Sequence, residues 1–354
     1  MRTVVAKLRA ALGERLLASP WLRRLDRISF LGTLDYHPKS QRRTSRLEHS
    51  LGVASLGLQL CDDLNLDSAL SRPFLAACLL HDIGHFPLSH AAEPGFARAL
   101  GVAHHGLSEW LVRGNGAIDR HTTLRPDLEA AGIDPELTWG LICGEVEDPS
   151  FAPLAALMRA PINLDTLDGI LRAARCFKIR GLRLPSQLFA ASDDGEIHLR
   201  PAAIRAIDRF WSLKDRVYGA VITLPSNIVC EAGLSAAVAK RFDRTIFARL
   251  ESFDDRSLDD LVREQVQKSG LDRGDDGRFY FVPSSERTVL LRRIRKRYYV
   301  DRQIHADDIG LPLQRWAGRY RHERQEMVLV AKHSVDQLQL ELDPTLSTSE
   351  APEL

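Results

Sequence analysis

Two imidazoles and two carboxylates occur in sequence contexts that suit a divalent metal ion. The dipeptide His81-Asp82 lies in the stretch Cys-Leu-Leu-His-Asp-Ile-Gly-His, His49 precedes it, and Asp165 follows in the run Leu-Asp-Thr-Leu-Asp. Imidazole favours Zn, Fe, Mn or Ni, and carboxylate also accepts Mg. More histidines stand close by in the sequence: His85, His90, His104 and His105. This combination is typical of metal-assisted hydrolysis.

The surroundings of Asp82 strengthen the case for a metal. Residues 74–83 are apolar on most faces of a predicted helix, which places His81 and Asp82 at the end of a buried element. Burying a carboxylate is costly unless another group compensates its charge, and a metal ion does so strongly. Neighbouring residues of a helix reach one ion only near a helix end or a distortion, which Gly84 and Pro87 predict.

The other ionisable residues each have a purely structural interpretation. A single histidine such as His49, inside an apolar helix, is more often a satisfied core residue than a ligand. Asp165 and Asp168 would both suit the dipole at a helix N-terminus, and we assign Asp168 that role alone. Arg46 could pair with Glu48 at the surface or bind a phosphate oxygen in the metal pocket. The residues themselves leave these alternatives open.

Helical periodicity dominates the elements that must position these side chains. Asn163 is a suitable N-cap, and Pro225 predicts a kink or a boundary. The predicted elements are a helix over 47–64, a helix beginning near Pro73 and reaching 83, a helix from Asn163 to 176, a short hairpin near 188–200 and a helical region over 201–242.

From Arg278 onward the residue pattern favours strands over helices. Residues 279–282 and 298–300 are rich in aromatic and β-branched side chains and predict strands. We therefore expect a mainly α fold with a helical core over 1–242, a small C-terminal α+β lobe over 243–342 and a disordered tail over 343–354.

Composition indicates an intracellular protein of ordinary charge. The chain has 354 residues, a net charge of +1 and five cysteines without a C-x-x-C pair. Scattered cysteines in odd number favour reduced thiols in a cytoplasmic protein. The N-terminal residues lack a signal-peptide core, and no apolar run is long enough to span a membrane, so we expect no membrane partner.

Three runs around the candidate residues resemble the HD-domain phosphohydrolases, and within them the deoxynucleoside triphosphate triphosphohydrolases of the dGTPase/SAMHD-like branch. The resemblance covers roughly residues 20–242. It rests on three runs, which are far more specific than a bare His-Asp pair. The runs are Thr44-Ser-Arg-Leu-Glu-His-Ser-Leu-Gly-Val53, His81-Asp-Ile-Gly-His-Phe-Pro-Leu-Ser-His90 and Leu164-Asp-Thr-Leu-Asp168.

The resemblance implies a mainly α HD-domain core with one divalent metal ion (Mn, Mg, Fe, Zn, Ni or Co) and room for a second Mg. The implied metal ligands are His49, His81, Asp82 and Asp165. The implied catalytic residues are His85, His90, Glu93 and His104, and the implied substrate-binding residues are Arg46 and Tyr218. A metal-activated water would hydrolyse a phosphoester bond of a nucleotide, with a histidine protonating the leaving oxygen.

Substitutions in the pocket separate this chain from that branch. They affect positions that read the sugar or hold the phosphates: Phe30 replaces Gln, Thr166 replaces Lys, Gly169 replaces Tyr, Ala173 replaces Asp and Phe210 replaces Arg. Hydrolysis of a (d)NTP to triphosphate stays the leading activity. The alternatives are a phosphomonoesterase or phosphodiesterase acting on another nucleotide or a nucleic-acid end, and a nucleotide-sensing HD scaffold.

A basic segment, residues 290–297, is the other conspicuous feature. Its ordinary interpretation is a solvated face of a strand or helix. Together with the nearby aromatic and arginine residues it could instead bind single-stranded nucleic acid or a nucleotide phosphate. By analogy with the family we also expect a homo-oligomer.

Overall fold

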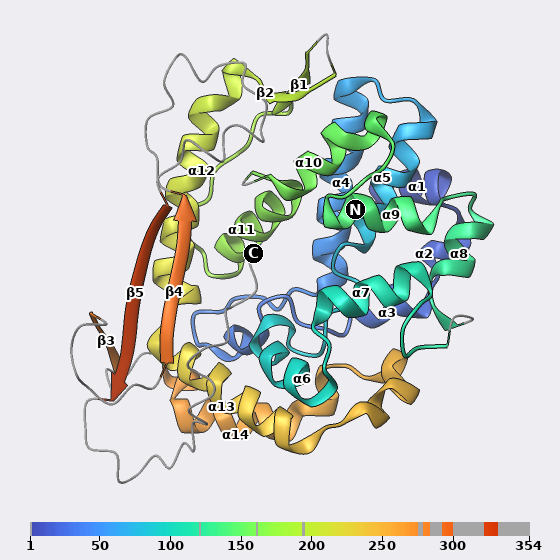
Figure 1. Cartoon of the computed structure of the whole chain (residues 1–354). Helices are drawn as coiled ribbons and strands as arrows, with labels where there is room; N and C mark the ends of the chain where they lie inside the picture. The colour runs from blue at the N-terminus through green and yellow to red at the C-terminus, as the bar shows by residue number, and fades with distance from the viewer. Residues whose placement is uncertain are drawn as a thin grey trace.

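The computed structural model describes residues 2–274 except 120, 121, 161, 193 and 194, and the backbone of strands 279–283, 292–299 and 322–331. Helices make up most of this part of the chain, which confirms the mainly α prediction (Figure 1). The α-helices are α1 Arg2–Leu12, α2 Glu14–Leu17, α3 Pro20–Leu25, α4 Arg46–Leu64, α5 Ser68–Leu80, α6 Glu93–Leu100, α7 His104–Arg113, α8 Arg125–Ala130, α9 Pro135–Cys143, α10 Ala152–Arg159, α11 Leu164–Cys176, α12 Ile204–Val217, α13 Pro225–Arg241 and α14 Asp259–Ser269.

Short helical turns and strands connect these helices. The 3-10 turns are η1 Gly32–Tyr36, η2 Ser89–Ala91, η4 Pro149–Phe151, η5 Pro201–Ala203, η7 Arg244–Ser252, η8 Asp255–Leu258 and η9 Leu271–Arg273, and η6 Tyr218–Ile222 is a π-helical turn. The strands are β1 Phe189–Ala191, β2 Ile197–Leu199, β3 Phe279–Pro283, β4 Arg292–Tyr299 and β5 His322–Ala331.

Helix α4 forms as the apolar spacing predicts. Ser45 caps its first turn, with its side chain accepting a hydrogen bond from the Glu48 amide at 3.2 Å. Asn65 ends it in the left-handed conformation, which asparagine tolerates better than most residues. Helix α4 packs on α5 and α11 and buries His49, so it delivers an imidazole to the interior.

Helix α5 is buried along its second half and ends where the site begins. Every residue from Pro73 to Leu80 is buried, and the helix stops at Leu80, with His81 as its C-cap. The expectation that Pro73 stands near the helix start is wrong, because Asp67 caps the helix and accepts from the Leu70 amide at 2.9 Å. Pro73 therefore lies inside the helix and costs it one backbone hydrogen bond.

Helix α11 and the elements after it follow the predicted order. The Asn163 side chain accepts from the Thr166 amide at 2.7 Å and caps α11. Strands β1 and β2 pair in antiparallel fashion, with Ala190 opposite His198, as the predicted hairpin requires.

Among the described residues, no single helix has both the length and the apolar character needed to cross a membrane. The two helical segments 201–222 and 225–241 reach that length and apolar character only when taken together, and they are bent by 65° relative to each other.

The segment 244–273 contacts the helical core. Asp255 accepts hydrogen bonds from the Ser29 amide at 2.8 Å and from the Leu88 amide at 2.7 Å, and Phe253 belongs to the same apolar cluster as α4 and α5. The boundary predicted at residue 242 stays a prediction.

Strands β3, β5 and β4 form an antiparallel sheet in that order. The strand expected over 279–282 is present as β3, and most of the basic segment 290–297 falls on β4. Residues 290, 291, 300 and the predicted tail 343–354 lie outside the described part of the chain. Nucleic-acid binding by the basic segment stays a prediction.

Candidate metal centre

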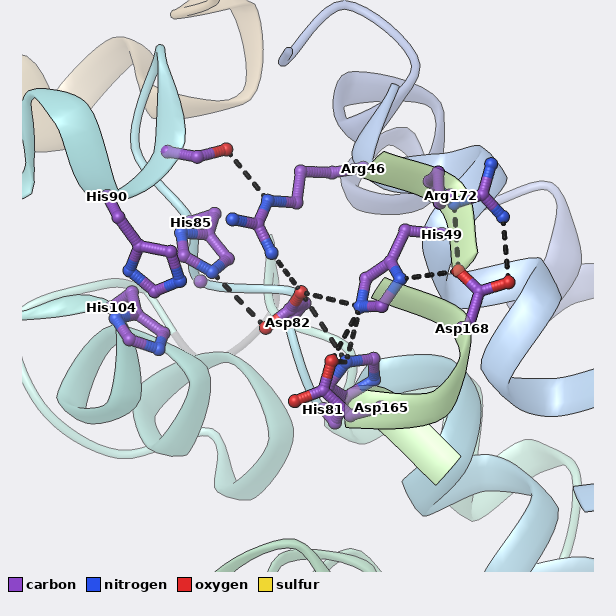
Figure 2. Close-up of polar contacts among 12 residues, drawn as sticks. Arg46, His49, His81, Asp82, His85, His90, His104, Asp165, Asp168 and Arg172 are labelled. Atoms are coloured by element: carbon purple, nitrogen blue, oxygen red, sulfur yellow. Dashed lines mark hydrogen bonds and ion pairs between the residues drawn. The ribbon is translucent and has the colours of Figure 1, made fainter. Parts of the chain in front are cut away.

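Ligand atoms of His49, His81 and Asp82, from α4 and the end of α5, lie close enough together to hold a metal ion, and Asp165 of α11 lies beside the two histidines (Figure 2). The Nε2 atoms of His49 and His81 lie 3.3 Å apart. Asp165 Oδ1 is 2.9 Å from the first and 3.7 Å from the second. Asp82 Oδ2 is 3.5 Å and 3.4 Å from the same two nitrogens. The four residues that the resemblance implies as ligands are thus brought together.

These separations suit a divalent ion. At bond lengths of ~2.0–2.2 Å, neighbouring donors lie ~3.4 Å apart in a tetrahedron and ~3.0 Å apart in an octahedron. The observed separations between histidine nitrogens and carboxylate oxygens, 2.9–3.7 Å, cover both arrangements. Two nitrogens and two oxygens form a donor set that accepts Mn, Fe, Co, Ni or Zn. His49, His81, Asp82 and Asp165 could therefore hold such an ion.

The second nitrogen of each candidate ligand histidine is also held. His49 Nδ1 is 2.7 Å from Asp168 Oδ2, and His81 Nδ1 is 3.0 Å from the Cys78 carbonyl oxygen. An acceptor on Nδ1 keeps the proton on that nitrogen, which leaves Nε2 as the atom that would bind a metal ion. Metal-binding histidines in proteins are usually oriented in this way. The Nδ1 contacts of His49 and His81 therefore also fit a bound metal ion.

The charges at the centre stabilise one another. Burial alone would lower the pKa of His81, but Asp82 and Asp165 raise it well above its usual range. Burial alone would raise the pKa of Asp82, but His81 and Arg46 hold it well below. The pKa of Asp165 is likewise held low against burial, by His49 and His81. Both carboxylates are therefore ionised, as metal binding requires.

Arg46 resolves the alternatives left open by the sequence. Its side chain is 3% exposed, its Nη1 pairs with Asp82 Oδ2, and its Nε donates to Ser89 Oγ at 2.7 Å. Glu48 instead pairs with Arg42 and accepts from Thr44. Arg46 therefore lies in the pocket and does not form the surface pair.

A second histidine cluster adjoins the centre through Asp82. The second carboxylate oxygen of Asp82, Oδ1, is 3.2 Å from His85 Nε2. The His85 ring stacks on that of His104 with centroids 4.2 Å apart, and His90 meets His85 edge-on at 4.7 Å. The ring nitrogens of these three histidines lie close enough to hold a cation. Asp82 thus links the two clusters through its two carboxylate oxygens.

Glu93 holds two histidines of this cluster in place through its carboxylate. It is buried in the first turn of α6, pairs with His104 Nδ1 and His90 Nδ1, and accepts the His104 amide hydrogen at 3.0 Å. Although burial acts in the opposite direction, the hydrogen bonds from His104 and His90 hold the pKa of Glu93 well below its usual range. Burial lowers the pKa of His90, and its hydrogen bond with Glu93 opposes that shift.

Phe30 and Gly169 fill the side of the centre where the resemblance places sugar-reading residues. The Phe30 ring lies 4.5 Å from the His49 ring and 4.8 Å from the Arg46 guanidinium carbon. A Cβ atom on Gly169 would stand 3.3 Å from Phe30 Cζ. The two substitutions thus complement each other in volume, and Phe210 is fully buried in the core.

Tyr218 lies beside Lys214, at the end of α12. Both residues are half-buried, and the Lys214 Nζ atom is 5.8 Å from the Tyr218 ring. Burial raises the pKa of Tyr218 to about 12, and the charge of Asp165 adds to that shift. Tyr218 therefore lies within electrostatic reach of Asp165.

Two residues of the centre were missed by the sequence reasoning. Asp168 was assigned to the helix dipole, but it is buried against His49 and pairs with Arg172 through two contacts of 2.8 and 3.0 Å. Arg172 also donates to Thr44 Oγ1 at 3.0 Å. The spacing of Asp165 and Asp168 on one face of α11 was the available signal.

The comparisons with known proteins agree with this geometry. Residues 46–118 match the HD domain family model. A protein of Rhodopseudomonas palustris named deoxyguanosinetriphosphate triphosphohydrolase-like is 29% identical over 168 residues, which are 45% of this chain and 38% of that protein. An uncharacterized protein of Mycoplasma genitalium is 32% identical over 164 residues. That match spans 43% of this chain and 36% of the relative, so the chain covers little more than a third of either protein's length.

Solved structures share the fold at low sequence identity. A phosphohydrolase from Bacteroides thetaiotaomicron superposes with a TM-score of 0.62 at 17% identity, covering 90% of this chain and 94% of that one. A hypothetical protein from Aquifex aeolicus gives 0.67 at 16% identity, covering 90% and 91%. Residues 46–118 of this chain thus match the HD domain family, and the chain shares its fold with the two solved structures.

Proposed function

We propose that this protein is a metal-dependent phosphohydrolase that acts on a nucleotide, with (d)NTP triphosphohydrolysis as the leading activity. The observation that carries the proposal is the convergence of His49, His81, Asp82 and Asp165 beside a second histidine cluster. A divalent ion bound there would supply Lewis-acid polarisation of a phosphoryl group. The name of the Rhodopseudomonas relative favours a nucleoside triphosphate as substrate.

The protein's own residues would bind and protonate the reacting group. Arg46 keeps its Nη2 atom without a hydrogen bond to the described residues, so this nitrogen can donate to a phosphate oxygen. His90 and His104 have Nδ1 fixed by Glu93, which leaves Nε2 of either ring to protonate the leaving oxygen. Asp165, with 44% of its side chain exposed, marks the side from which the substrate would enter.

A second candidate follows from the Phe30 side of the centre. The aromatic ring on His49 replaces a polar group expected to read a sugar, and Phe210 is buried where an arginine was expected. Each lost hydrogen-bonding contact weakens binding by about 1–3 kcal/mol. A phosphomonoesterase or phosphodiesterase acting on another nucleotide is the activity that these losses favour.

Product analysis tests the proposal. The purified protein with Mn²⁺ would be incubated with dNTPs, NTPs, nucleoside monophosphates and short single-stranded DNA, and Asp82→Ala would serve as the control. Intact triphosphate plus nucleoside supports the leading activity, and inorganic phosphate or shortened DNA supports the second. Because Asp82 stands between both clusters, the variant should lose bound metal and hydrolysis together. Hydrolysis by a metal-free Asp82→Ala protein would exclude the metal mechanism.

A further inference from the structure

The arginines at the metal centre are already bound to its carboxylates. Arg46 pairs with Asp82, and Arg172 contacts both oxygens of Asp168 at 2.8 and 3.0 Å. A substrate with several phosphate groups brings more negative charge than these paired guanidinium groups can balance. Next to Asp165 on α11 stands Thr166, which has no charge and whose amide is used by the Asn163 cap.

Lys214 is a cation on the helix that neighbours α11. It lies on α12, which packs on α11 (Figure 1). Its electrostatic partner is Asp165, the most exposed of the candidate ligands. Burial lowers the pKa of Lys214 to about 8, and the charge of Asp165 opposes that shift. The ammonium group therefore lies within electrostatic reach of Asp165.

Two aromatic rings hold the Lys214 side chain. Its Nζ atom is 5.4 Å from the Trp211 ring and 5.8 Å from the Tyr218 ring, and Trp211 is buried. These rings attract the ammonium group but accept none of its three hydrogens as a carboxylate or phosphate oxygen would. Within the described residues Lys214 forms no hydrogen bond and no ion pair. A half-buried ammonium that has kept its donors is suited to an anionic ligand.

We infer that Lys214 binds a phosphate group of the substrate beside the metal centre, and so supplies from α12 the positive charge that Thr166 does not supply from α11. The inference rests on the proposed phosphohydrolase function and adds a substrate-binding residue to it. It also gives the aromatic pair Trp211 and Tyr218 a role, because the two rings hold the ammonium group.

The test is binding of inorganic tripolyphosphate to the Mn²⁺-loaded protein, measured by calorimetry. Lys214→Met should weaken this binding about tenfold to a hundredfold, the effect of losing one charged hydrogen bond. Lys214→Arg should recover most of the affinity. The Mn²⁺ content of both variants should equal that of the wild type, because Lys214 is not a candidate ligand. In hydrolysis assays Lys214→Met should raise KM more than it lowers kcat.

The matched control is Arg209→Met, which removes one positive charge from an exposed position of the same helix. Wild-type affinity in Lys214→Met, or an equal loss in Arg209→Met, would overturn the assignment of Lys214 while leaving the phosphohydrolase proposal intact. A wild-type protein that holds Mn²⁺ but neither binds tripolyphosphate nor hydrolyses any nucleotide would overturn both.

Discussion

Which nitrogen of each histidine faces the carboxylates decides the chemistry of this centre. His49 and His81 both turn Nε2 inward because their Nδ1 atoms are engaged, one by the Asp168 carboxylate and the other by the Cys78 carbonyl. The first acceptor carries a full charge and the second is a neutral backbone group. The Asp168 contact should therefore contribute more to the basicity of its histidine and to metal affinity.

Asp168→Asn tests this difference. The amide keeps the shape of the side chain but removes the charge that orients His49 and pairs with Arg172. We expect the affinity for Mn²⁺ to fall about 10- to 100-fold, as for other residues that support metal-binding histidines. Metal titration monitored by calorimetry measures it, with Asp215→Asn, an exposed position on α12, as the control. Equal Mn²⁺ affinity in both variants would contradict a supporting role for Asp168.

The candidate ligands could be chosen from the sequence, whereas their supports could not. His81 and Asp82 stand out because a buried carboxylate at the end of an apolar helix needs compensation. Asp168 does not stand out, because an aspartate in the first turns of a helix is common for reasons unrelated to metals. Only the packing of α4 on α11 brings it against His49, and the charge of Asp165 acts on Lys214 through the equally non-local contact of α11 with α12.

At the scale of elements, the end of α5 is held against α7 by a close approach at Gly84. A Cβ atom there would lie 2.3 Å from the His104 carbonyl oxygen and 2.4 Å from the Ser108 amide nitrogen. The Gly84 amide also donates to Ser108 Oγ at 3.0 Å. This contact joins the element that carries His81 and Asp82 to the element that carries His104, and so fixes the distance between the two histidine clusters.

Gly84→Ala should separate these two elements. Because the clashing atoms belong to the backbone, relief requires a shift of α7 or of the turn, and overpacking of this kind costs about 1–3 kcal/mol. We expect a lower midpoint of urea unfolding together with weaker Mn²⁺ binding. Gly219→Ala is the control, since a Cβ atom at Gly219 meets nothing within 4 Å. Equal urea midpoints for the two variants would show that the protein can accommodate a Cβ atom at Gly84 beside the backbone of α7 without loss of stability.

Helix periodicity predicted most elements because the apolar positions of α4 and the cap of α11 are local signals. The start of α5 was predicted too late for a related reason. Pro73 is a frequent first-turn residue, but the Asp67 side chain caps the helix before it, and the interior of the protein tolerates the missing hydrogen bond. A helix that is buried on most faces gains enough from packing to keep a proline in its second turn.

At the scale of the whole molecule, segments far apart in the sequence meet around buried charges. Arg27 pairs with Asp254 at 2.6 Å, Arg43 pairs with Asp255, and Asp255 accepts from the Ser29 and Leu88 amides. These contacts join the turns before α4 to the turns before α14. No local pattern predicts them, because each partner alone resembles an ordinary surface charge.

Asp35, in η1, is the member of this network that should cost stability. Burial raises its pKa from 3.8 to about 6, against the hydrogen bond from Ser29, and its Oδ1 atom has no hydrogen-bond partner. Between these two pH values the folded protein binds more protons than the unfolded chain. The free energy of unfolding contributed by this group therefore falls as the pH rises from about 4 to 6.

Asp35→Asn removes that slope. Relative to the wild type, the variant should gain stability between pH 4 and pH 7, by at most about 3 kcal/mol for a shift of this size. The ion pair with Arg43 offsets little of this gain, because Arg43 is 58% exposed and its charge is screened by water. Urea unfolding of both proteins at several pH values measures the difference, with Asp215→Asn as a control for loss of one exposed carboxylate. A difference that stays constant with pH would mean that Asp35 ionises in the folded protein as it does in the unfolded chain, and that the network around it compensates its burial in full.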